Sequence, residues 1–203
     1  MRGTTMGLTR DLSGLASLVR GWTVELAGRD GEGRGSGVIW HPDGLIATNA
    51  HVATASRYGI RLADGREVEG RVLVRDERRD VALVDIELPA LPVLPLGEPG
   101  ALRAGSIVLA LGHPWGVTNA MSLGVVHAVS RDRRGAPRYI AADVRLAPGN
   151  SGGPLVDAAG RIVGLNAMVV GGLGVAIPVN VVERVVREAI AAGAIPQRLA
   201  WAA

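Results

Sequence analysis

The chain has 203 residues, 48% of them hydrophobic and 20% charged, so it is long enough to bury a core without disulfides or metals. The absence of cysteine excludes thiolate nucleophiles and cysteine zinc sites. All 22 basic residues are arginine, which excludes lysine-based phosphate loops and Schiff bases, and 19 acidic residues leave a net charge of only +3.

The charge and hydropathy patterns do not indicate a nucleic-acid or membrane partner. The basic runs Arg75–Arg79 and Arg131–Arg134 contain acidic residues, so we expect solvated loop tips there. No apolar run reaches the ~18 residues of a membrane span. Residues 1–10 lack the apolar stretch of a signal peptide, and on that ground we expect a cytoplasmic location, with export only if the chain is a processed or truncated form.

Two helices are predicted, one at each end of the chain. Residues 11–19 carry apolar side chains at helical spacing, which predicts a short amphipathic helix. Near the C-terminus, the apolar stripe predicts a second helix over residues 181–192. Asn180 and Glu183 have the spacing of a capping box at its start, and Gly193 ends it.

Between the helices, from about residue 22 to 178, the pattern is that of strands. Apolar residues alternate over Val68–Val74 and are continuous over Val81–Leu88 and Ile107–Leu111. Asp64-Gly65 predicts a hairpin turn, and the 29 glycines are typical of a turn-rich all-β chain. The glycine- and proline-containing stretch 96–101 is the candidate linker between two halves of similar size, which predicts two small barrels.

The segment Pro148–Leu155 reads Pro-Gly-Asn-Ser-Gly-Gly-Pro-Leu and is the most informative part of the chain. Glycines on both sides of Ser151 allow the backbone to turn so that successive N–H groups point to one spot beside the hydroxyl. A tetrahedral oxyanion needs such donors, and we assign them to the N–H groups of Gly149 and Ser151. A tight turn with an incidental serine is the alternative, but the pattern favours a nucleophile loop.

A nucleophilic serine needs a base, and the chain has four histidines. His51 directly follows the apolar stretch 44–50, where a rigid strand would present a side chain. His41 lies in a turn, His113 in a loop and His127 within a strand-like run, so we expect structural roles for these three. His51 is therefore the predicted base.

The base needs an orienting carboxylate, and Asp80 is the candidate. It precedes the apolar strand 81–84, which would bury it. Asp85 competes, but it lies five residues further along the same strand and so on the opposite face. Asp80 could instead bond local amides at a loop end.

The order of the candidate residues along the chain, His51 then Asp80 then Ser151, distinguishes between the known folds of serine hydrolases. Gly149–Gly153 matches the Gly-x-Ser-x-Gly elbow of α/β-hydrolases, but that fold needs a histidine after the serine, and none follows His127. The subtilisin order places the aspartate before the histidine. Only the chymotrypsin order fits.

With these residues in view, the chain resembles chymotrypsin-fold serine proteases, and specifically the HtrA (Deg) family, over about residues 12–195. The segments that carry the likeness are Gly35–Ile39, Thr48–Val52, Asp80–Val84, Asp143–Leu155, Gly160–Asn166 and Gly174–Pro178. The resemblance implies an all-β fold of two six-stranded antiparallel β-barrels, with a short N-terminal helix, a C-terminal helix and the active site between the barrels.

The resemblance also implies an activity, that of a serine endopeptidase acting on unfolded or flexible protein segments. His51 would take the proton of Ser151, Asp80 would fix the imidazole tautomer, and water would release the acyl-enzyme, without metal or cofactor. A catalytically silent chaperone or binding module on the same fold is the alternative. Proteins or peptides are the expected substrates.

Family members usually carry C-terminal PDZ domains and often trimerise through aromatic residues near the N-terminus. Here we expect a single protease domain over residues 1–203 without a PDZ domain, with barrels at about 21–96 and 104–179. Because that region offers only Trp22, we expect a monomer or weak oligomer, with a trimer as the alternative.

The specificity pocket is expected to be aliphatic, which favours small or medium aliphatic side chains before the scissile bond. Arg145 occupies the position that forms the pocket floor in trypsin-like enzymes. It either turns to solvent or pairs with Asp143, or else it selects acidic side chains. The aliphatic lining is expected from Leu146, Met168, Val169 and Leu173.

Overall fold

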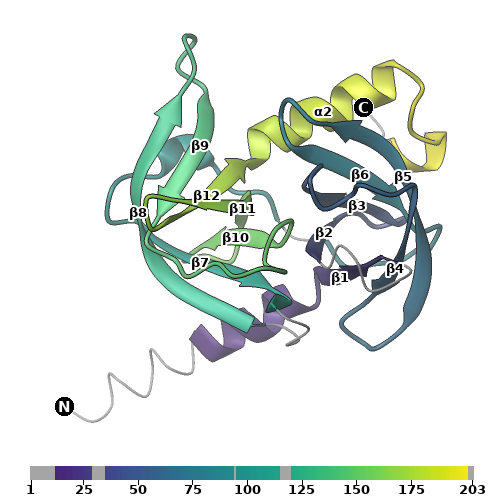
Figure 1. The fold of residues 1–203 in the computed structure, drawn as a ribbon, viewed down its shortest axis with the longest axis horizontal. Helices are drawn as coiled ribbons and strands as arrows, with labels where there is room; N and C mark the ends of the chain where they lie inside the picture. The colour runs from purple at the N-terminus through teal and green to yellow at the C-terminus, as the bar shows by residue number, and fades with distance from the viewer. Residues whose placement is uncertain (1–11, 29–34, 94, 115–119, 201–203) are drawn as a thin grey trace.

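Two closed six-stranded antiparallel barrels form the molecule in a computed structural model that describes residues 12–28, 35–93, 95–114 and 120–200 (Figure 1). The predicted all-β, two-barrel fold is confirmed. The first barrel runs in the order β1-β2-β3-β6-β5-β4 and the second in the order β10-β11-β12-β9-β8-β7. The strands of the first barrel are β1 (Thr23–Ala27), β2 (Gly35–His41), β3 (Leu45–Thr48), β4 (Arg57–Arg61), β5 (Glu67–Asp76) and β6 (Val81–Asp85). Those of the second are β7 (Ile107–Gly112), β8 (Ala120–Arg131), β9 (Pro137–Ala142), β10 (Pro154–Asp157), β11 (Ile162–Val170) and β12 (Leu173–Pro178).

Strand β6 explains why its sequence is continuously apolar. Every residue of this strand is buried. Ala82 and Val84 point into the first barrel, whereas Val81 and Leu83 join the core cluster that the two barrels share with α2. Because successive side chains of a strand face opposite sides, a strand buried on both faces cannot alternate. The same geometry places the start of β6 at the junction of the barrels.

Both helices pack against the core cluster that the two barrels share. Residues 12–20 are helical, close to the predicted 11–19, and α2 (Val179–Ala191) runs from the end of β12 behind the first barrel (Figure 1). The predicted capping box is wrong: Pro178 is the N-cap, and the amide of Asn180 instead donates to the carbonyl of Pro137 at 3.0 Å. Gly193, with φ +66°, follows the helix as expected.

The connection between the barrels packs against the second barrel and is partly ordered as a 3-10 helix, η1 (Pro99–Ala101). Leu96 forms a parallel bridge with Ile162, and the N–H of Gly97 donates to the Ile162 carbonyl at 2.7 Å. A second 3-10 helix, η3 (Gln197–Leu199), lies near the C-terminus. In the described ranges, no helix is long and apolar enough to cross a membrane.

Candidate active site

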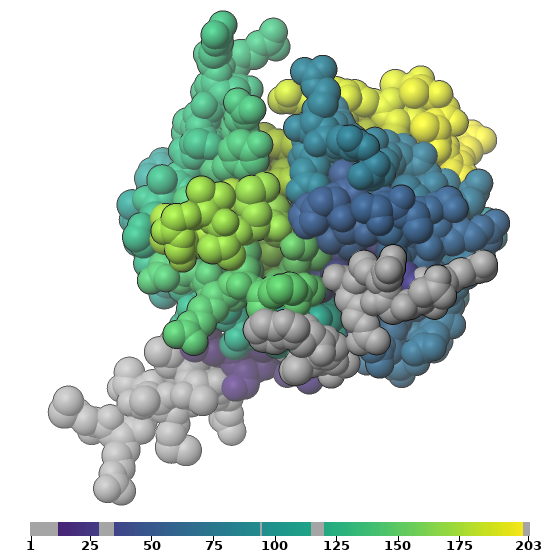
Figure 2. All heavy atoms as spheres, viewed as in Figure 1, coloured from purple at the N-terminus to yellow at the C-terminus, as the bar shows by residue number. Residues whose placement is uncertain are grey.

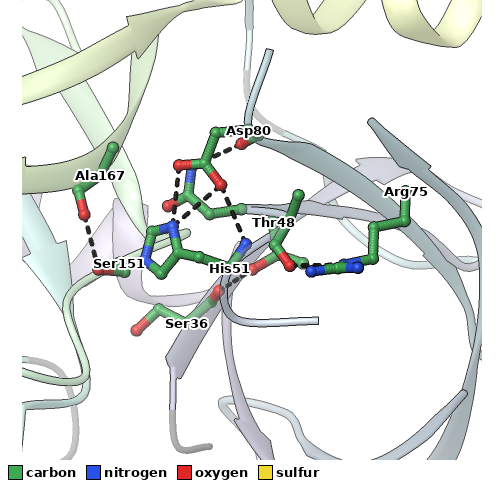
Figure 3. Close-up of polar contacts among 9 residues, drawn as sticks. Ser36, Thr48, His51, Arg75, Asp80, Ser151 and Ala167 are labelled. Atoms are coloured by element: carbon green, nitrogen blue, oxygen red, sulfur yellow. Dashed lines mark hydrogen bonds and ion pairs between the residues drawn. The ribbon is translucent and has the colours of Figure 1, made fainter. Parts of the chain in front are cut away.

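Strand pairing brings His51 and Asp80 together. Strands β3 and β6 are antiparallel, with Thr48 opposite Ala82, so the chain leaving β3 passes the chain entering β6. The imidazole Nδ1 of His51 lies 2.8 Å from Oδ2 of Asp80 and 3.0 Å from Oδ1. The backbone N–H of His51 also donates to Oδ1, at 3.0 Å. One carboxylate therefore fixes both the ring and the backbone of the histidine (Figure 3).

The backbone at Asp80 is in the left-handed region, with φ +54°. Such a conformation costs free energy for a residue other than glycine, so neighbouring contacts must hold it. The amide of Asn49 donates to the Asp80 carbonyl at 3.0 Å. On the other side, the guanidinium Nε of Arg75 donates to the carbonyl of Ala50 at 2.9 Å. The segment that carries His51 is thus tied to both β5 and the β5–β6 turn.

The loop that carries Ser151 is packed so tightly that two positions after the serine require glycine. Gly152 has φ +84°, and a Cβ there would lie 2.0 Å from the carbonyl oxygen of Ser36. A Cβ on Gly153 would lie 2.2 Å from the carbonyl oxygen of Leu111. The N–H of Gly152 donates to Asn166 in β11 at 2.8 Å, which anchors the loop to the second barrel.

Ser36 in β2 joins this loop to the first barrel. Its N–H donates to the carbonyl of Ser151 at 2.8 Å, and its hydroxyl donates to the carbonyl of Gly149 at 2.7 Å. The hydroxyl also accepts from the N–H of His113 at 3.0 Å and lies 3.3 Å from the Nδ1 of that residue. Because the hydroxyl has only one proton, which it gives to Gly149, this contact requires Nδ1 of His113 to be the protonated nitrogen.

Burial lowers the pKa of His113 below its ordinary value of 6.5; Glu25 opposes this effect and Arg61 adds to it. The neutral imidazole is therefore favoured beneath the loop that carries Ser151. The structural role expected for His113 agrees with this position, since only 4% of the residue is exposed.

The hydroxyl of Ser151 points away from the histidine ring. It donates to the carbonyl of Ala167 in β11 at 2.9 Å (Figure 3). Among the described residues, Ser151 Oγ makes no hydrogen bond to His51, whose side chain is 47% exposed. The N–H groups of Gly149 and Ser151 donate to no protein acceptor within the same ranges. The structure therefore brings His51 and Asp80 into contact and places Ser151 beside them in a different hydrogen bond.

Asp85, the competing carboxylate, is bound elsewhere. Both of its oxygens accept from the guanidinium of Arg198 at 2.6 Å, and its side chain is fully buried. Of the remaining histidines, His41 is buried and accepts from the N–H of Asp43, whereas His127 is exposed on β8.

A cavity of about 580 Å³ opens beside His51. Of the five residues predicted to line a specificity pocket, only Met168 contributes to it. Leu146 packs against the core of the second barrel, and Val169 is more than half exposed. Arg145 is exposed, and its N–H donates to the hydroxyl of Ser122 at 2.8 Å. The cavity is lined by Ala50, His51, Arg75, Glu77, Arg78, Asp80, Tyr139, Ala167 and Met168.

Sequence reasoning assigned no roles to Ser36, Asn49 and Thr48. The hydroxyl of Thr48 donates to the carbonyl of Ser36 at 2.7 Å, so all three residues support the loops of the site. Two features of the sequence point to such roles. Ser36 lies between two glycines, and Asn49 lies two residues before His51, the predicted base. In the part of the chain that the structure describes, no group of three or more His, Cys, Asp or Glu residues is arranged to hold a metal.

Comparisons with known proteins support these observations. The family model "Trypsin-like peptidase domain" matches residues 35–165. A protein of Synechocystis named as the serine protease HhoB is 39% identical over 76% of this chain and 39% of its own length. A DegP-like periplasmic serine endoprotease of Pseudomonas fluorescens is 41% identical over 75% of this chain and 34% of its own. The solved structure of the HtrA-type protease AlgW with a tripeptide has a TM-score of 0.81 and 32% identity, covering 89% of this chain and 64% of that one.

These relatives correct the expected location. The name of the Pseudomonas fluorescens protein places it in the periplasm, which contradicts the cytoplasmic expectation and points to an exported location. That expectation relied on the composition of residues 1–10. A domain that needs no disulfide can fold in either compartment, so the rest of the sequence carried no opposing signal.

The chain spans less than half the length of the curated relatives it matches. The matched region nevertheless includes the segments that hold His51, Asp80 and Ser151. The chain belongs to the family of trypsin-like peptidase domains, and its relatives include HtrA- and Deg-type serine proteases.

Proposed function

We propose that the domain is a serine endopeptidase that hydrolyses peptide bonds in unfolded or flexible protein segments. The observation that carries the proposal is the bond between the Nδ1 of His51 and the Asp80 carboxylate at 2.8 Å. It leaves the other ring nitrogen of His51 free to accept a proton, as a general base requires. The peptides bound in the AlgW structures support a peptide substrate.

In the proposed reaction, Ser151 attacks the peptide carbonyl while His51 takes its proton. The N–H groups of Gly149 and Ser151 stabilise the resulting oxyanion. His51 then gives the proton to the leaving amine, and an acyl-enzyme forms on Ser151. Water releases the acid product by the same steps, again with His51 as the base, while Asp80 stabilises the imidazolium in each half.

In this proposal, the hydrogen bond from the Ser151 hydroxyl to the Ala167 carbonyl belongs to the enzyme without substrate. Strand β11 pairs with β10 as far as Leu165 and bonds the Ser151 loop through Asn166, which leaves its edge from Ala167 onward for a substrate strand. A substrate N–H that bonds the Ala167 carbonyl would take the place of the Ser151 hydroxyl. Rotation of the serine side chain would then bring Oγ to His51.

For specificity, we propose small or medium aliphatic side chains before the scissile bond, accepted against Leu146, Met168, Val169 and Leu173. The exposure of Arg145 supports a position outside the pocket. We also propose that the domain acts outside the cytoplasm, as the name of its periplasmic relative suggests.

Labelling with a fluorophosphonate and cleavage of casein test the activity. Wild type should label and cleave. Ser151→Ala should do neither while it melts at the same temperature, with turnover reduced by a factor on the order of 10⁶ by analogy with other serine proteases. Activity of Ser151→Ala within tenfold of wild type would exclude this mechanism. A folded wild type that neither labels nor cleaves would instead favour a silent binding module.

A further inference from the structure

A second cavity, of about 430 Å³, adjoins the cavity at His51. Its walls come from the β5–β6 turn, the β8–β9 hairpin and the first turns of α2. Figure 2 shows the corresponding notch between that hairpin and that turn, with α2 behind it. We name it the arginine groove, because Arg78, Arg79, Arg138 and Arg184 line it.

Of these four arginines, Arg79 is the one that forms ion pairs in the described ranges, and Arg184 lies near enough to Asp132 and Glu188 to lower the pKa of both carboxyls. Arg79 binds Asp76 at 2.9 Å and Glu188 at 2.6 Å. In the described ranges, Arg78 and Arg184 form no hydrogen bond or ion pair through their side chains, and Arg138 only lies over the ring of Tyr139, 5.5 Å from its centroid. Three cations in one groove therefore lack a bound carboxylate.

The acidic residues of the groove already have partners. Asp76 accepts from both the backbone and the guanidinium of Arg79. Asp132 accepts from the N–H groups of Arg134 and Ala136, at 2.8 and 3.0 Å, and so shapes the β8–β9 turn. Neither aspartate forms an ion pair with the three remaining arginines. Counted with Glu188, which binds Arg79, four arginines face three carboxylates, so the groove keeps a net charge of 4 − 3 = +1.

The groove is continuous with the cavity at the catalytic residues. Arg78 and Tyr139 line both cavities, and His51, Ala167 and Met168 line the first. A polypeptide whose scissile bond lies at Ser151 and which passes Tyr139 enters the arginine groove within a few residues. Two adjoining cavities fit an extended chain better than a single enclosed anion.

We propose that the arginine groove binds carboxylate side chains of the substrate, a few residues from the scissile bond on one flank. This inference rests on the proposed peptidase function and specifies its substrate class: flexible segments in which an acidic cluster lies beside the cleaved site. Arginine binds carboxylates through two parallel N–H donors, which suits Arg78 and Arg184. The groove shares Arg78 and Tyr139 with the cavity at His51, which favours a side chain of the bound substrate over a separate nucleic acid.

The test uses two cleavable peptides with the same core, one carrying three glutamates on a flank and the other glutamines at the same positions. Each pair is made for the N-terminal and the C-terminal flank. On one flank, we expect kcat/KM to be about tenfold higher for the glutamate peptide, because exposed ion pairs are individually weak. This ratio should approach one as salt rises from about 0.05 to about 0.5 M.

Charge reversal identifies the groove as the cause. Arg78→Glu and Arg184→Glu should bring the ratio of kcat/KM for the glutamate and glutamine peptides to one or below. For these two variants, kcat/KM should instead rise for a peptide with lysines on the same flank. Arg187→Glu is the matched control: this residue is exposed on the same helix but does not line the groove, so the ratio should stay at its wild-type value. Equal effects of Arg184→Glu and Arg187→Glu would overturn the proposal.

A binding measurement separates this proposal from the peptidase function. The anisotropy of a labelled glutamate peptide should report binding to the Ser151→Ala protein. The double variant that carries both Ser151→Ala and Arg184→Glu should bind the peptide about tenfold more weakly. If wild type cleaves both peptides equally, the groove proposal fails and the peptidase function stands. If the glutamate peptide binds but wild type cleaves neither peptide, the peptidase function fails and the groove proposal stands. A labelled single-stranded oligonucleotide that binds more tightly and is released by Arg184→Glu would overturn the proposal in favour of nucleic acid.

Discussion

The backbone N–H of Ser36, in the first barrel, donates a hydrogen bond to the carbonyl of Ser151, in the second, over 2.8 Å. The two barrels are therefore joined at Ser151, the proposed nucleophile. The Ser36 hydroxyl adds a second link by donating to the carbonyl of Gly149, one of the residues assigned to the oxyanion site. Any shift between the barrels would move this loop relative to His51.

Ser36→Ala should lower both stability and kcat. The change leaves the buried N–H of His113 and the carbonyl of Gly149 without a partner, which costs about 1–3 kcal/mol in free energy of unfolding. We expect kcat to fall at least tenfold, with a smaller change in KM, because the loop keeps only its backbone bond to Ser36 and loses the one from the hydroxyl. Urea unfolding and peptide kinetics measure both. Ser130→Ala, at an exposed serine of β8, is the control, and an unchanged kcat in Ser36→Ala would contradict a positioning role.

Asp80→Asn should remove activity while keeping the fold. An amide at this position leaves His51 in the wrong tautomer, for which the well-studied serine protease case gives a loss of about 10⁴ in kcat. Asp85→Asn is the comparison: it breaks the buried pair with Arg198 and should lower stability, but not kcat of the folded protein. The reverse outcome, with Asp85→Asn inactive and Asp80→Asn active, would show that the acid is misassigned.

Gly152→Ala should disrupt the loop that carries Ser151. The new Cβ would lie 2.0 Å from the Ser36 carbonyl and 2.2 Å from the Thr48 hydroxyl, so the backbone must move. We expect a loss of kcat of at least about 10²-fold, since misplacement of a reacting group by about 1 Å has that effect. Gly171→Ala provides the control: φ there is +58°, but a Cβ meets nothing within 4 Å. Gly171→Ala should lower the free energy of unfolding by only about 1 kcal/mol, from backbone strain. Peptide kinetics should therefore show a loss of kcat for Gly152→Ala and none for Gly171→Ala.

Stability should fall as the pH drops through the titration of His113. Burial lowers the pKa of this residue in the folded state, so the unfolded chain binds a proton at higher pH than the folded protein does. Stability is therefore lost from about pH 6.5 downward to the folded pKa, at no more than about 1.4 kcal/mol per pH unit for this group.

Urea unfolding at a series of pH values measures this slope. His113→Asn should flatten it, whatever its effect on absolute stability, and His127→Asn, at an exposed position, should not. His41, whose pKa burial also lowers, should leave a residual slope in the same direction. An identical slope in wild type and His113→Asn would contradict the prediction.

Arg145→Ala should leave the residue preference before the scissile bond unchanged. The wild-type side chain is exposed, and the aliphatic residues of the proposed pocket should prefer valine, leucine or alanine by about tenfold. Profiling a peptide library with both proteins measures the preference. An acidic preference in wild type that disappears in Arg145→Ala would place the guanidinium inside the pocket.

The sequence by itself determined the fold class and the order of the site residues. Glycines around Ser151 specify a tight turn because only glycine tolerates the left-handed conformation and the close backbone approach found at Gly152. The uninterrupted apolar run of β6 specified a strand buried on both faces. These are local properties of the chain, so residue type and spacing report them directly.

Only the tertiary structure decided which distant residues support the site. Asn180 has the sequence of a cap, but its amide reaches Pro137 because β9 packs beside the start of α2. Ser36 meets Ser151 only because two closed barrels fix their separation, and Arg79 pairs with Glu188 for the same reason. Such contacts depend on barrel closure and strand register, which a one-dimensional pattern of hydrophobicity and charge does not encode.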